Sequence, residues 1–220
     1  MKTAAIFGTT GLIGSQLVQL LDKNISYQKV YAFARKRPEL LLSKIEHITF
    51  NSESIQIPEG VDDIFVCLGT TMKKAGSKEA FIKVDYEMVV EIAKQAKSSN
   101  VKRLIVVSSL GADPISSNFY LQTKGRMEEA VKQFDFDYCG IVRPSLLLGN
   151  RKEFRFGEKV AIVFFKIFSF IFVGSIKKYK GIYAQDVAKG MIMLAQSGLG
   201  KVTVESNFIK QLADEYTKQQ

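Results

Sequence analysis

The sequence predicts an α/β protein in which helices cover both faces of a doubly wound parallel sheet. Three observations support this class. Short apolar runs alternate with longer amphipathic stretches, the first run ends in a glycine-rich turn, and the composition suits a globular domain. Of the 220 residues, 46% are apolar and 24% are charged, which is enough for one good core. Because no repeat or linker divides the sequence, we expect a single domain over residues 1–220.

Strands are expected where β-branched and aromatic residues form short runs, and helices where apolar residues recur at helical spacing. The expected strands are residues 3–7, 29–34, 47–50, 64–68, 104–107, 138–142 and 202–205. After the helix that follows the first turn, further helices are expected at residues 81–97, 119–133 and 184–196. This alternation favours parallel strands joined by right-handed crossover connections.

The first expected strand runs directly into a turn that contains three glycines. Gly8, Gly11 and Gly14 follow a G-x-x-G-x-x-G spacing. Between these glycines stand Thr9, Thr10, Leu12 and Ile13. A helix follows, and in such a strand–turn–helix unit the glycines let the backbone approach a pyrophosphate that the helix N-terminus then binds. The turn therefore predicts a dinucleotide site in a Rossmann-type sheet.

The second expected strand ends at a basic residue in the position that recognises the adenosine ribose. Arg35 lies twenty-one residues after Gly14, where NAD-binding folds carry an acid that accepts hydrogen bonds from the two ribose hydroxyls. An arginine instead offers a planar fork that suits a 2′-phosphate. We therefore expect NADP, with NADPH preferred over NADH.

A tyrosine and a lysine lie one helical turn apart in the expected helix 119–133. Tyr120 and Lys124 are four residues apart, which places the phenol and the ammonium on one face. A nearby cation favours a phenolate and lowers the pKa of a tyrosine, so that the hydroxyl can exchange protons near neutral pH. Ser108 and Ser109 precede this pair and follow a strand, where a hydroxyl can hold a substrate carbonyl. The four residues predict a proton-transfer site.

Other common catalytic chemistries lack the residues that they need. His47 is the only histidine, and no G-x-S-x-G turn accompanies it, so we expect an exposed strand residue. Cys67 and Cys139 each fall within an expected strand and are expected to be buried, reduced thiols. No cluster of metal ligands is found. Because the sequence has no apolar signal-peptide core, we expect a cytoplasmic location.

The strongest local charge belongs to a phenylalanine-rich segment. Residues 151–180 contain eight Lys and Arg against two Glu, a net +6 of the chain's +9. The apolar stretch between these cations is interrupted and shorter than the ~20 residues that span a bilayer. Three interpretations of residues 154–180 stay open. They are a lid or packing helix in a substrate region at 145–182, which is favoured, a subunit interface of a homodimer, and a helix that makes peripheral contact with a membrane surface. A monomer is equally compatible, and no motif supports nucleic-acid binding.

Six motifs follow one another along nearly the whole chain. They occupy residues 8–14, 67–71, 74–76, 108–113, 116–125 and 143–145. In this order and spacing, they resemble the short-chain dehydrogenase/reductase superfamily, and within it the atypical, Tat-interacting-protein-like oxidoreductase branch. The resemblance implies a sheet of strand order 3-2-1-4-5-6 with a seventh strand near Val202. It also implies that the 8–14 turn contacts the pyrophosphate and that Arg35 contacts the adenosine end.

The resemblance further implies which loops line the cofactor. Leu68, Gly69 and Thr70, after the fourth strand, would line it, and Pro144 and Ser145, after the sixth, would border the nicotinamide. Related proteins often carry an acid after the third strand for the adenine amino group. Asn51 or Ser52 stands near that point in this chain, so this departure puts the adenine contact in doubt.

The implied reaction is hydride transfer from NADPH to a carbonyl carbon, or the reverse oxidation of an alcohol. Tyr120 would exchange the proton with the substrate oxygen, Ser109 would hydrogen-bond that oxygen, and Lys124 would lower the tyrosine pKa and hold the nicotinamide ribose. Ser109 is preferred over Ser108 because it lies one residue further beyond the strand. The substrate is expected to be an apolar small molecule. The alternative is an NADPH-binding redox-sensing or regulatory protein with little turnover.

Overall fold

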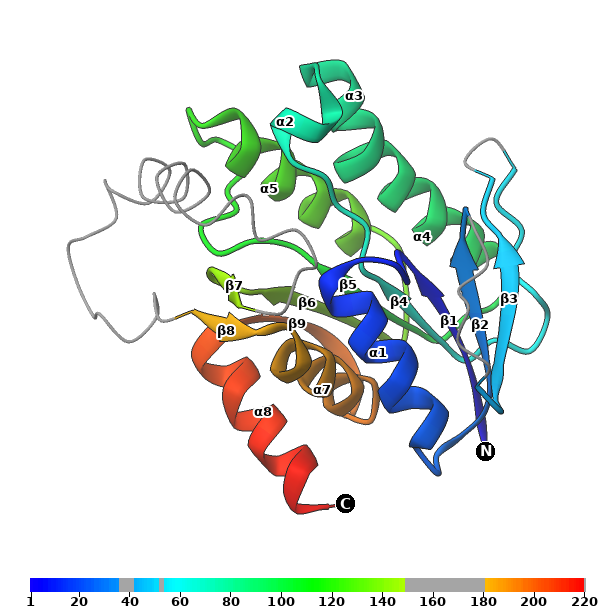
Figure 1. Cartoon of the computed structure of the whole chain (residues 1–220). Helices are drawn as coiled ribbons and strands as arrows, with labels where there is room; N and C mark the ends of the chain where they lie inside the picture. The colour runs from blue at the N-terminus through cyan, green and yellow to red at the C-terminus, as the bar shows by residue number, and fades with distance from the viewer. Residues whose placement is uncertain (36–41, 52–53, 149–180, 220) are drawn as a thin grey trace.

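Seven parallel strands form one sheet in the order β3-β2-β1-β4-β5-β6-β9 (Figure 1). The computed structural model describes residues 1–35, 42–51, 54–148 and 181–219. The strands are β1 Lys2–Phe7, β2 Tyr27–Ala34, β3 Ile45–Thr49, β4 Asp63–Val66, β5 Arg103–Val107, β6 Tyr138–Arg143 and β9 Gly200–Glu205. The strand order confirms the order 3-2-1-4-5-6, and β9 is the expected seventh strand, paired with β6.

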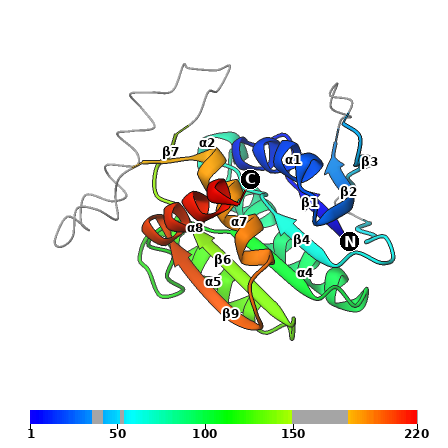
Figure 2. The same ribbon diagram turned by 90° about the horizontal axis from the view of Figure 1, so that it is seen from below.

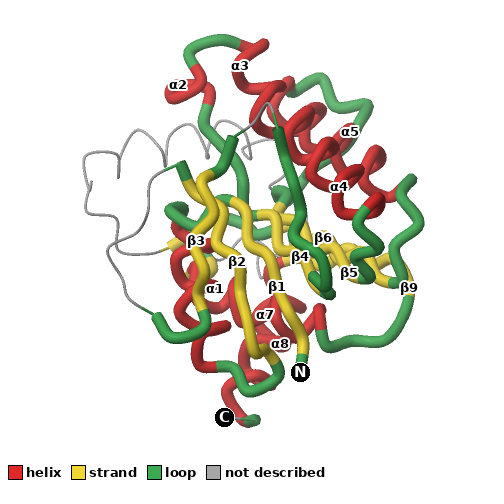
Figure 3. The backbone as a smooth tube through the Cα atoms, turned by 90° about the vertical axis from the view of Figure 1, so that its right-hand side faces the viewer, coloured by secondary structure: helices red, strands yellow, loops and turns green. Residues whose placement is uncertain are grey.

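Helices cover both faces of this sheet. They are α1 Leu12–Lys23, α2 Met72–Ala75, α3 Lys78–Ile82, α4 Met88–Ser98, α5 Phe119–Lys132, α7 Ala184–Ala195 and α8 Ser206–Lys218, and a π-helical turn, η1 Lys83–Glu87, joins α3 to α4. Helices α1, α7 and α8 lie on one face, and α4 and α5 lie on the other (Figure 2). Figure 3 shows the strands enclosed between these two groups of helices. The fold is therefore of the Rossmann type.

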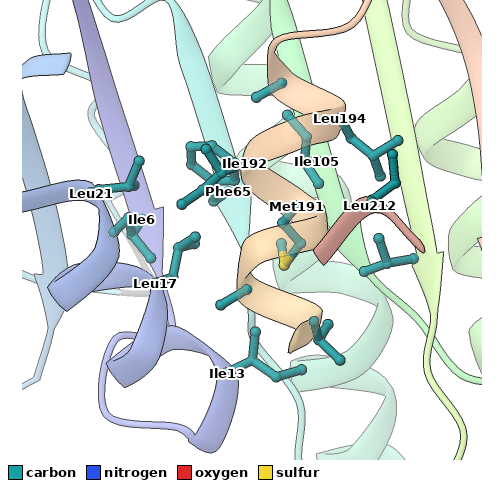
Figure 4. Close-up of a cluster of buried hydrophobic side chains, with 14 of the residues drawn as sticks. Ile6, Ile13, Leu17, Leu21, Phe65, Ile105, Met191, Ile192, Leu194 and Leu212 are labelled. Atoms are coloured by element: carbon teal, nitrogen blue, oxygen red, sulfur yellow. The ribbon is translucent and has the colours of Figure 1, made fainter. Parts of the chain in front are cut away.

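The central strands are apolar on both faces because each face meets a layer of helices. In β1, Ala4 and Ile6 pack in the core beneath α1 and α7, whereas Ala5 and Phe7 pack in the core beneath α4. Figure 4 shows the first of these cores, in which Leu17 of α1 and Ile192 of α7 lie beside the sheet residues Ile6, Phe65 and Ile105. These continuous apolar strands are the ones that the sequence predicts best.

Some elements differ from the expectation. Helix α8 is not predicted, although its buried residues Ile209, Leu212, Ala213 and Tyr216 recur at helical spacing. The helix expected at 81–97 is a longer helical run over residues 78–98 that contains η1. A two-stranded sheet, β7 Leu147–Leu148 with β8 Ile182–Tyr183, is not predicted because each strand is only two residues long.

The small sheet joins the two described ends of the expected substrate region 145–182. The Ile182 amide donates a hydrogen bond to the Leu146 carbonyl at 2.9 Å. Residues 149–180 lie outside the described residues. The structure therefore does not bear on the three interpretations of residues 154–180.

Two expectations about single residues need correction. His47 lies on β3, but it is half-buried instead of exposed, and among the described residues its Nε2 has no hydrogen-bond partner. Cys67 follows β4 instead of lying within it and is half-buried, whereas Cys139 is buried in β6. Both thiols are free. Burial raises the pKa of the Cys67 thiol to about 12 and that of the Cys139 thiol to about 11.

Candidate active site

The candidate site lies at the carboxyl edge of the sheet, where the strand order reverses between β1 and β4. Phe7 at the end of β1 pairs with Val66 at the end of β4. The Cys67 amide then donates a hydrogen bond to the Phe7 carbonyl at 2.8 Å. The loops that follow the two strands therefore leave the sheet side by side, and ligands of doubly wound sheets bind in the crevice at this point.

The glycines of the first turn allow very close backbone packing. Gly8 has a φ of +86°, and a Cβ on it would lie 2.6 Å from the Cys67 carbonyl oxygen. A Cβ on Gly14 would lie 2.2 Å from the Gly8 carbonyl oxygen, and the same oxygen accepts a hydrogen bond from the Gly11 amide at 3.1 Å. A side chain at Gly8 would push the turn away from the loop that follows β4. A side chain at Gly14 would push α1 away from the turn.

The N-terminus of α1 faces this turn without a side-chain cap. Gly11 is the N-cap residue, and the first turn of the helix contains no acidic residue. Thr10 and Gly11 are exposed, whereas Thr9 is buried and its hydroxyl donates to the Phe33 carbonyl of β2 at 3.3 Å. Leu12 is half-buried, and the Ile13 side chain lies in the core. The open helix terminus and the tight turn fit the diphosphate of a dinucleotide.

Arg35 lies beside this turn. It is the first residue after β2, it is exposed, and it is two residues from the Phe33 carbonyl that holds Thr9. The structure therefore brings Arg35 to the sheet edge that carries the glycine turn. Asn51 is exposed shortly after β3, and Ser52 lies outside the described residues.

Tyr120 and Lys124 lie in the first two turns of α5. The Asn118 side chain accepts a hydrogen bond from the Leu121 amide at 3.1 Å, which caps the helix and fixes its start at Phe119. Tyr120 is half-buried, with its ring 5.6 Å from that of Phe81. Lys124 is only 3% exposed. A lysine so deeply buried requires an opposite charge.

Asp85 of η1 provides that charge, and sequence analysis did not identify it. The Lys124 ammonium lies 2.7 Å from Asp85 Oδ1, and Asp85 Oδ2 accepts a hydrogen bond from the Thr70 amide at 2.8 Å. Burial acts to lower the pKa of Lys124, but the charge of Asp85, with a smaller contribution from Tyr120, outweighs it and leaves the pKa raised. One signal was available: Asp85 interrupts the buried helical stripe of Phe81 and Val89.

The two serines have different surroundings. Ser108 donates to Glu128 Oε1 at 2.5 Å, and Glu128 also accepts from Arg143 Nε at 2.8 Å and from Arg143 Nη2 at 2.6 Å. Among the described residues, the Ser109 hydroxyl makes one long hydrogen bond, of 3.4 Å, to the Leu110 carbonyl. Ser108 is thus held in an internal network, and Ser109 has the less constrained hydroxyl. Glu128 was also missed, because Ser108 and Arg143 are far from it in the sequence.

A glycine brings the serine loop close to α5. A Cβ on Gly125 would lie 2.2 Å from the backbone of Asp113 and Pro114, and the Asp113 amide donates to the Leu121 carbonyl at 3.2 Å. The loop that begins at Ser109 therefore crosses directly over the helix that carries Tyr120.

The loops after β4 and β6 complete this edge. Leu68 and Thr70 are half-buried and Gly69 is exposed. A Cβ on Gly69 would lie 3.4 Å from Asp85 Oδ1 and 4.0 Å from the Lys124 nitrogen, so this loop covers the ion pair.

Pro144 and Ser145 are buried beside the serine loop. The Pro144 carbonyl accepts from the Leu110 amide at 3.1 Å, and the Ser145 amide donates to the Ser206 hydroxyl at 2.7 Å. The structure thus brings the residues after β1, β4, β5 and β6 to one edge.

Within residues 1–35, 42–51, 54–148 and 181–219, no group of three or more His, Cys, Asp or Glu side chains is placed to hold a metal ion. In the same ranges, no helix combines the length and the apolar character needed to cross a bilayer.

Comparisons with known proteins concern the family of this chain. A family model described as NAD(P)H-binding matches residues 8–161. A protein named FMP52, mitochondrial, from Candida albicans is 34% identical over 210 residues, which cover 88% of this chain and 88% of that protein. A protein of the same name from Kluyveromyces lactis is 36% identical over 202 residues, with 87% of this chain and 88% of that protein covered.

Solved structures show the same fold. The oxidoreductase ylbE from Lactococcus lactis superposes with a TM-score of 0.66 at 20% identity, covering 98% of this chain and 97% of that chain. A putative NAD-dependent epimerase/dehydratase from Bacillus halodurans superposes with a TM-score of 0.69 at 19% identity, covering 98% and 100%. At such identities the likeness concerns the fold alone.

The expected cytoplasmic location is contradicted. Relatives from four yeasts, aligned over 68% to 97% of this chain, are named mitochondrial. The expectation relied on the missing apolar core of a secretory signal. That feature does not bear on mitochondrial import, because import sequences are amphipathic and rich in arginine and serine.

Proposed function

Because the chain belongs to the NAD(P)H-binding family and has the Rossmann fold of the short-chain dehydrogenase/reductase superfamily, we propose that it is an NADP-dependent oxidoreductase. It interconverts a carbonyl compound and the corresponding alcohol, and its substrate is an apolar small molecule. The observation that carries this proposal is the buried Lys124 cation one helical turn from Tyr120, beneath the loop that follows β4.

The cofactor is held along the carboxyl edge. The backbone of the turn formed by Gly8, Thr9, Thr10, Gly11, Leu12, Ile13 and Gly14 binds the diphosphate. Arg35 pairs with the 2′-phosphate, because a guanidinium matches phosphate oxygens in a bidentate manner. Leu68, Gly69 and Thr70 line the cofactor, and Pro144 and Ser145 border the nicotinamide. When bound, NADPH supplies a hydride to the carbonyl carbon.

Three side chains transfer the proton and stabilise the negative charge that develops in the reaction. The Ser109 hydroxyl donates a hydrogen bond to the substrate carbonyl oxygen, which fixes its position and favours negative charge on it. Tyr120 donates its proton to that oxygen as the alcohol forms. The Lys124 cation stabilises the phenolate that remains. In the oxidation direction the same phenolate accepts the proton.

A conservative change at Tyr120 tests this assignment. Tyr120→Phe removes the hydroxyl and keeps the ring that packs on Phe81. We expect at least a ~100-fold loss of kcat for carbonyl reduction, since general acid–base groups contribute about 10²–10⁴-fold, with NADPH affinity unchanged. Tyr31→Phe, in β2, is the matched control. NADPH oxidation across aldehydes, ketones and quinones supplies the assay, and a wild-type rate in Tyr120→Phe would refute the role.

A regulatory protein that binds NADPH with little turnover is the second candidate. One observation favours it: the Lys124 ammonium already forms an ion pair with Asp85. Tight NADPH binding without oxidation on any carbonyl of the panel would establish it over the enzyme.

We also propose a mitochondrial location, on the strength of the relatives' names. Fractionation of cells that produce the full chain tests it, and recovery in the cytosolic fraction alone would overturn it.

A further inference from the structure

A π-helical turn interrupts the long helical run that begins at Lys78. The Met88 amide bonds back to the Lys83 carbonyl, five residues earlier, so the turn holds one more residue than an α-helical turn. Asp85 is the buried residue of this turn, between Phe81 and Val89. Single π-turns inside helices are rare and often mark functional sites. Here, the turn carries a carboxylate into an otherwise apolar stripe.

The carboxylate contacts two elements of the proposed site. Its Oδ1 lies 2.7 Å from the Lys124 nitrogen, and its Oδ2 accepts the Thr70 amide at 2.8 Å. The side chains of Lys124 and Asp85 are 4% and 1% exposed. A buried ion pair is seldom the most stable choice, because apolar residues of similar volume often serve as well or better. A role beyond stability therefore explains the pair better.

Other charged groups near Lys124 are already engaged. Glu128 lies one turn further along α5, but Ser108 and Arg143 occupy its oxygens. Tyr120 lies one turn earlier and is the proposed proton donor. The loop at Gly69 and Thr70 covers the pair with uncharged groups. Among the described residues, Asp85 is thus the carboxylate in direct contact with this ammonium.

We propose that Asp85 is a positioning residue whose negative charge keeps Lys124 a cation and ties it to the cofactor loop at Thr70. This inference rests on the proposed function, since it assigns how Lys124 is prepared to stabilise the Tyr120 phenolate. A neutral residue of the same shape keeps the contact with the Thr70 amide and loses the charge. Asp85→Asn therefore separates the two roles.

The test begins with nucleotide-free protein. The ¹³Cε signal of Lys124, assigned with Lys124→Met, is followed by NMR against pH. We expect wild-type Lys124 to stay charged above the ordinary lysine pKa of 10.5. In Asp85→Asn its titration should move down by about one pH unit or more, because burial then acts without an opposing charge. Glu87→Gln, which neutralises an exposed acid of the same π-turn, is the control and should leave the titration unchanged.

Kinetics provides the second readout. Asp85→Asn should lower kcat at least ~10-fold at neutral pH, with KM within about twofold, and should have no further effect in a Lys124→Met background. An unaltered Lys124 titration in Asp85→Asn overturns the inference, whatever the activity. If Asp85→Asn does not fold, titration of Lys124 below pH 10.5 in the wild type overturns it instead. A wild type that reduces no carbonyl overturns the proposed function and leaves the titration result standing.

Discussion

Arg35 is the residue on which the choice between the two nicotinamide dinucleotides depends. It is exposed at the end of β2, next to the glycine turn. Arg35→Ala should weaken NADPH binding about 10-fold or more, since charge-assisted bonds to phosphate are worth about 1.5–3 kcal/mol. NADH binding should change little, because NADH has no 2′-phosphate. Calorimetric titration of both nucleotides measures this, with Lys29→Ala as a control on the same strand. Equal affinity of the wild type for NADPH and NADH would end the assignment.

A buried acid at the opposite edge of the sheet should make stability depend on pH. Asp63 accepts a hydrogen bond from the Tyr27 hydroxyl at 2.5 Å, and its Oδ2 lies 3.0 Å from the Lys2 nitrogen. Burial raises the pKa of Asp63 above 3.8 and outweighs the opposing effects of Tyr27 and Lys2. The folded state therefore keeps a proton on this carboxyl that the unfolded state loses. The contribution of that proton to the free energy of unfolding is fully present below about pH 4. It is lost as pH rises through the pKa of Asp63 in the folded state.

The comparison with Asp63→Asn isolates this effect. The free energy of unfolding of the wild type, relative to that of Asp63→Asn, should decrease as pH rises above about 4. Urea titrations at several pH values measure it, with the exposed Glu59→Gln as the control. A difference that rises over this range would contradict the sign of the pKa shift.

At the scale of elements, the strand–turn–helix unit of β1 and α1 depends on its glycines. Gly14→Ala places a methyl group 2.2 Å from the Gly8 carbonyl oxygen, so α1 must shift. We expect a loss of about 1–3 kcal/mol in unfolding free energy, as for overpacked cores, together with weaker NADPH binding. Gly198→Ala is the matched control, because nothing lies within 4 Å of its added Cβ. Wild-type stability and binding in Gly14→Ala would show that the turn is not the diphosphate site.

The same scale shows what sequence patterns can and cannot predict. Central strands such as β4 and β5 are predictable because both of their faces are buried, which leaves a continuous apolar run. Helix α5 is predictable from its spacing and its Asn118 cap. The η1 turn is not, because a π-turn follows from packing around Asp85 and has no propensity signal. Contacts such as Lys124–Asp85 and Ser108–Glu128 join distant segments, and spacing within one helix does not reveal them.

At the scale of the whole molecule, the sheet order places the turn of Gly8, the β4 loop and the start of α5 at one edge. The sequence contains each of these parts. They come together because β1 pairs with β4 and because the loop at Asp113 packs closely against α5 at Gly125. The family was predictable because its motifs occur in order along the chain. The location was not predictable in the same way. The expectation of a cytoplasmic location relied on the missing apolar core of a secretory signal, which concerns secretion alone.

Calorimetric titration of the wild-type protein with NADPH tests the central claim most directly. The carboxyl edge should bind one NADPH per chain, with an affinity at least about 10-fold tighter than that for NADH, and Gly14→Ala should weaken this binding. No heat from either nucleotide, at a protein concentration that would detect a millimolar Kd, would contradict the account.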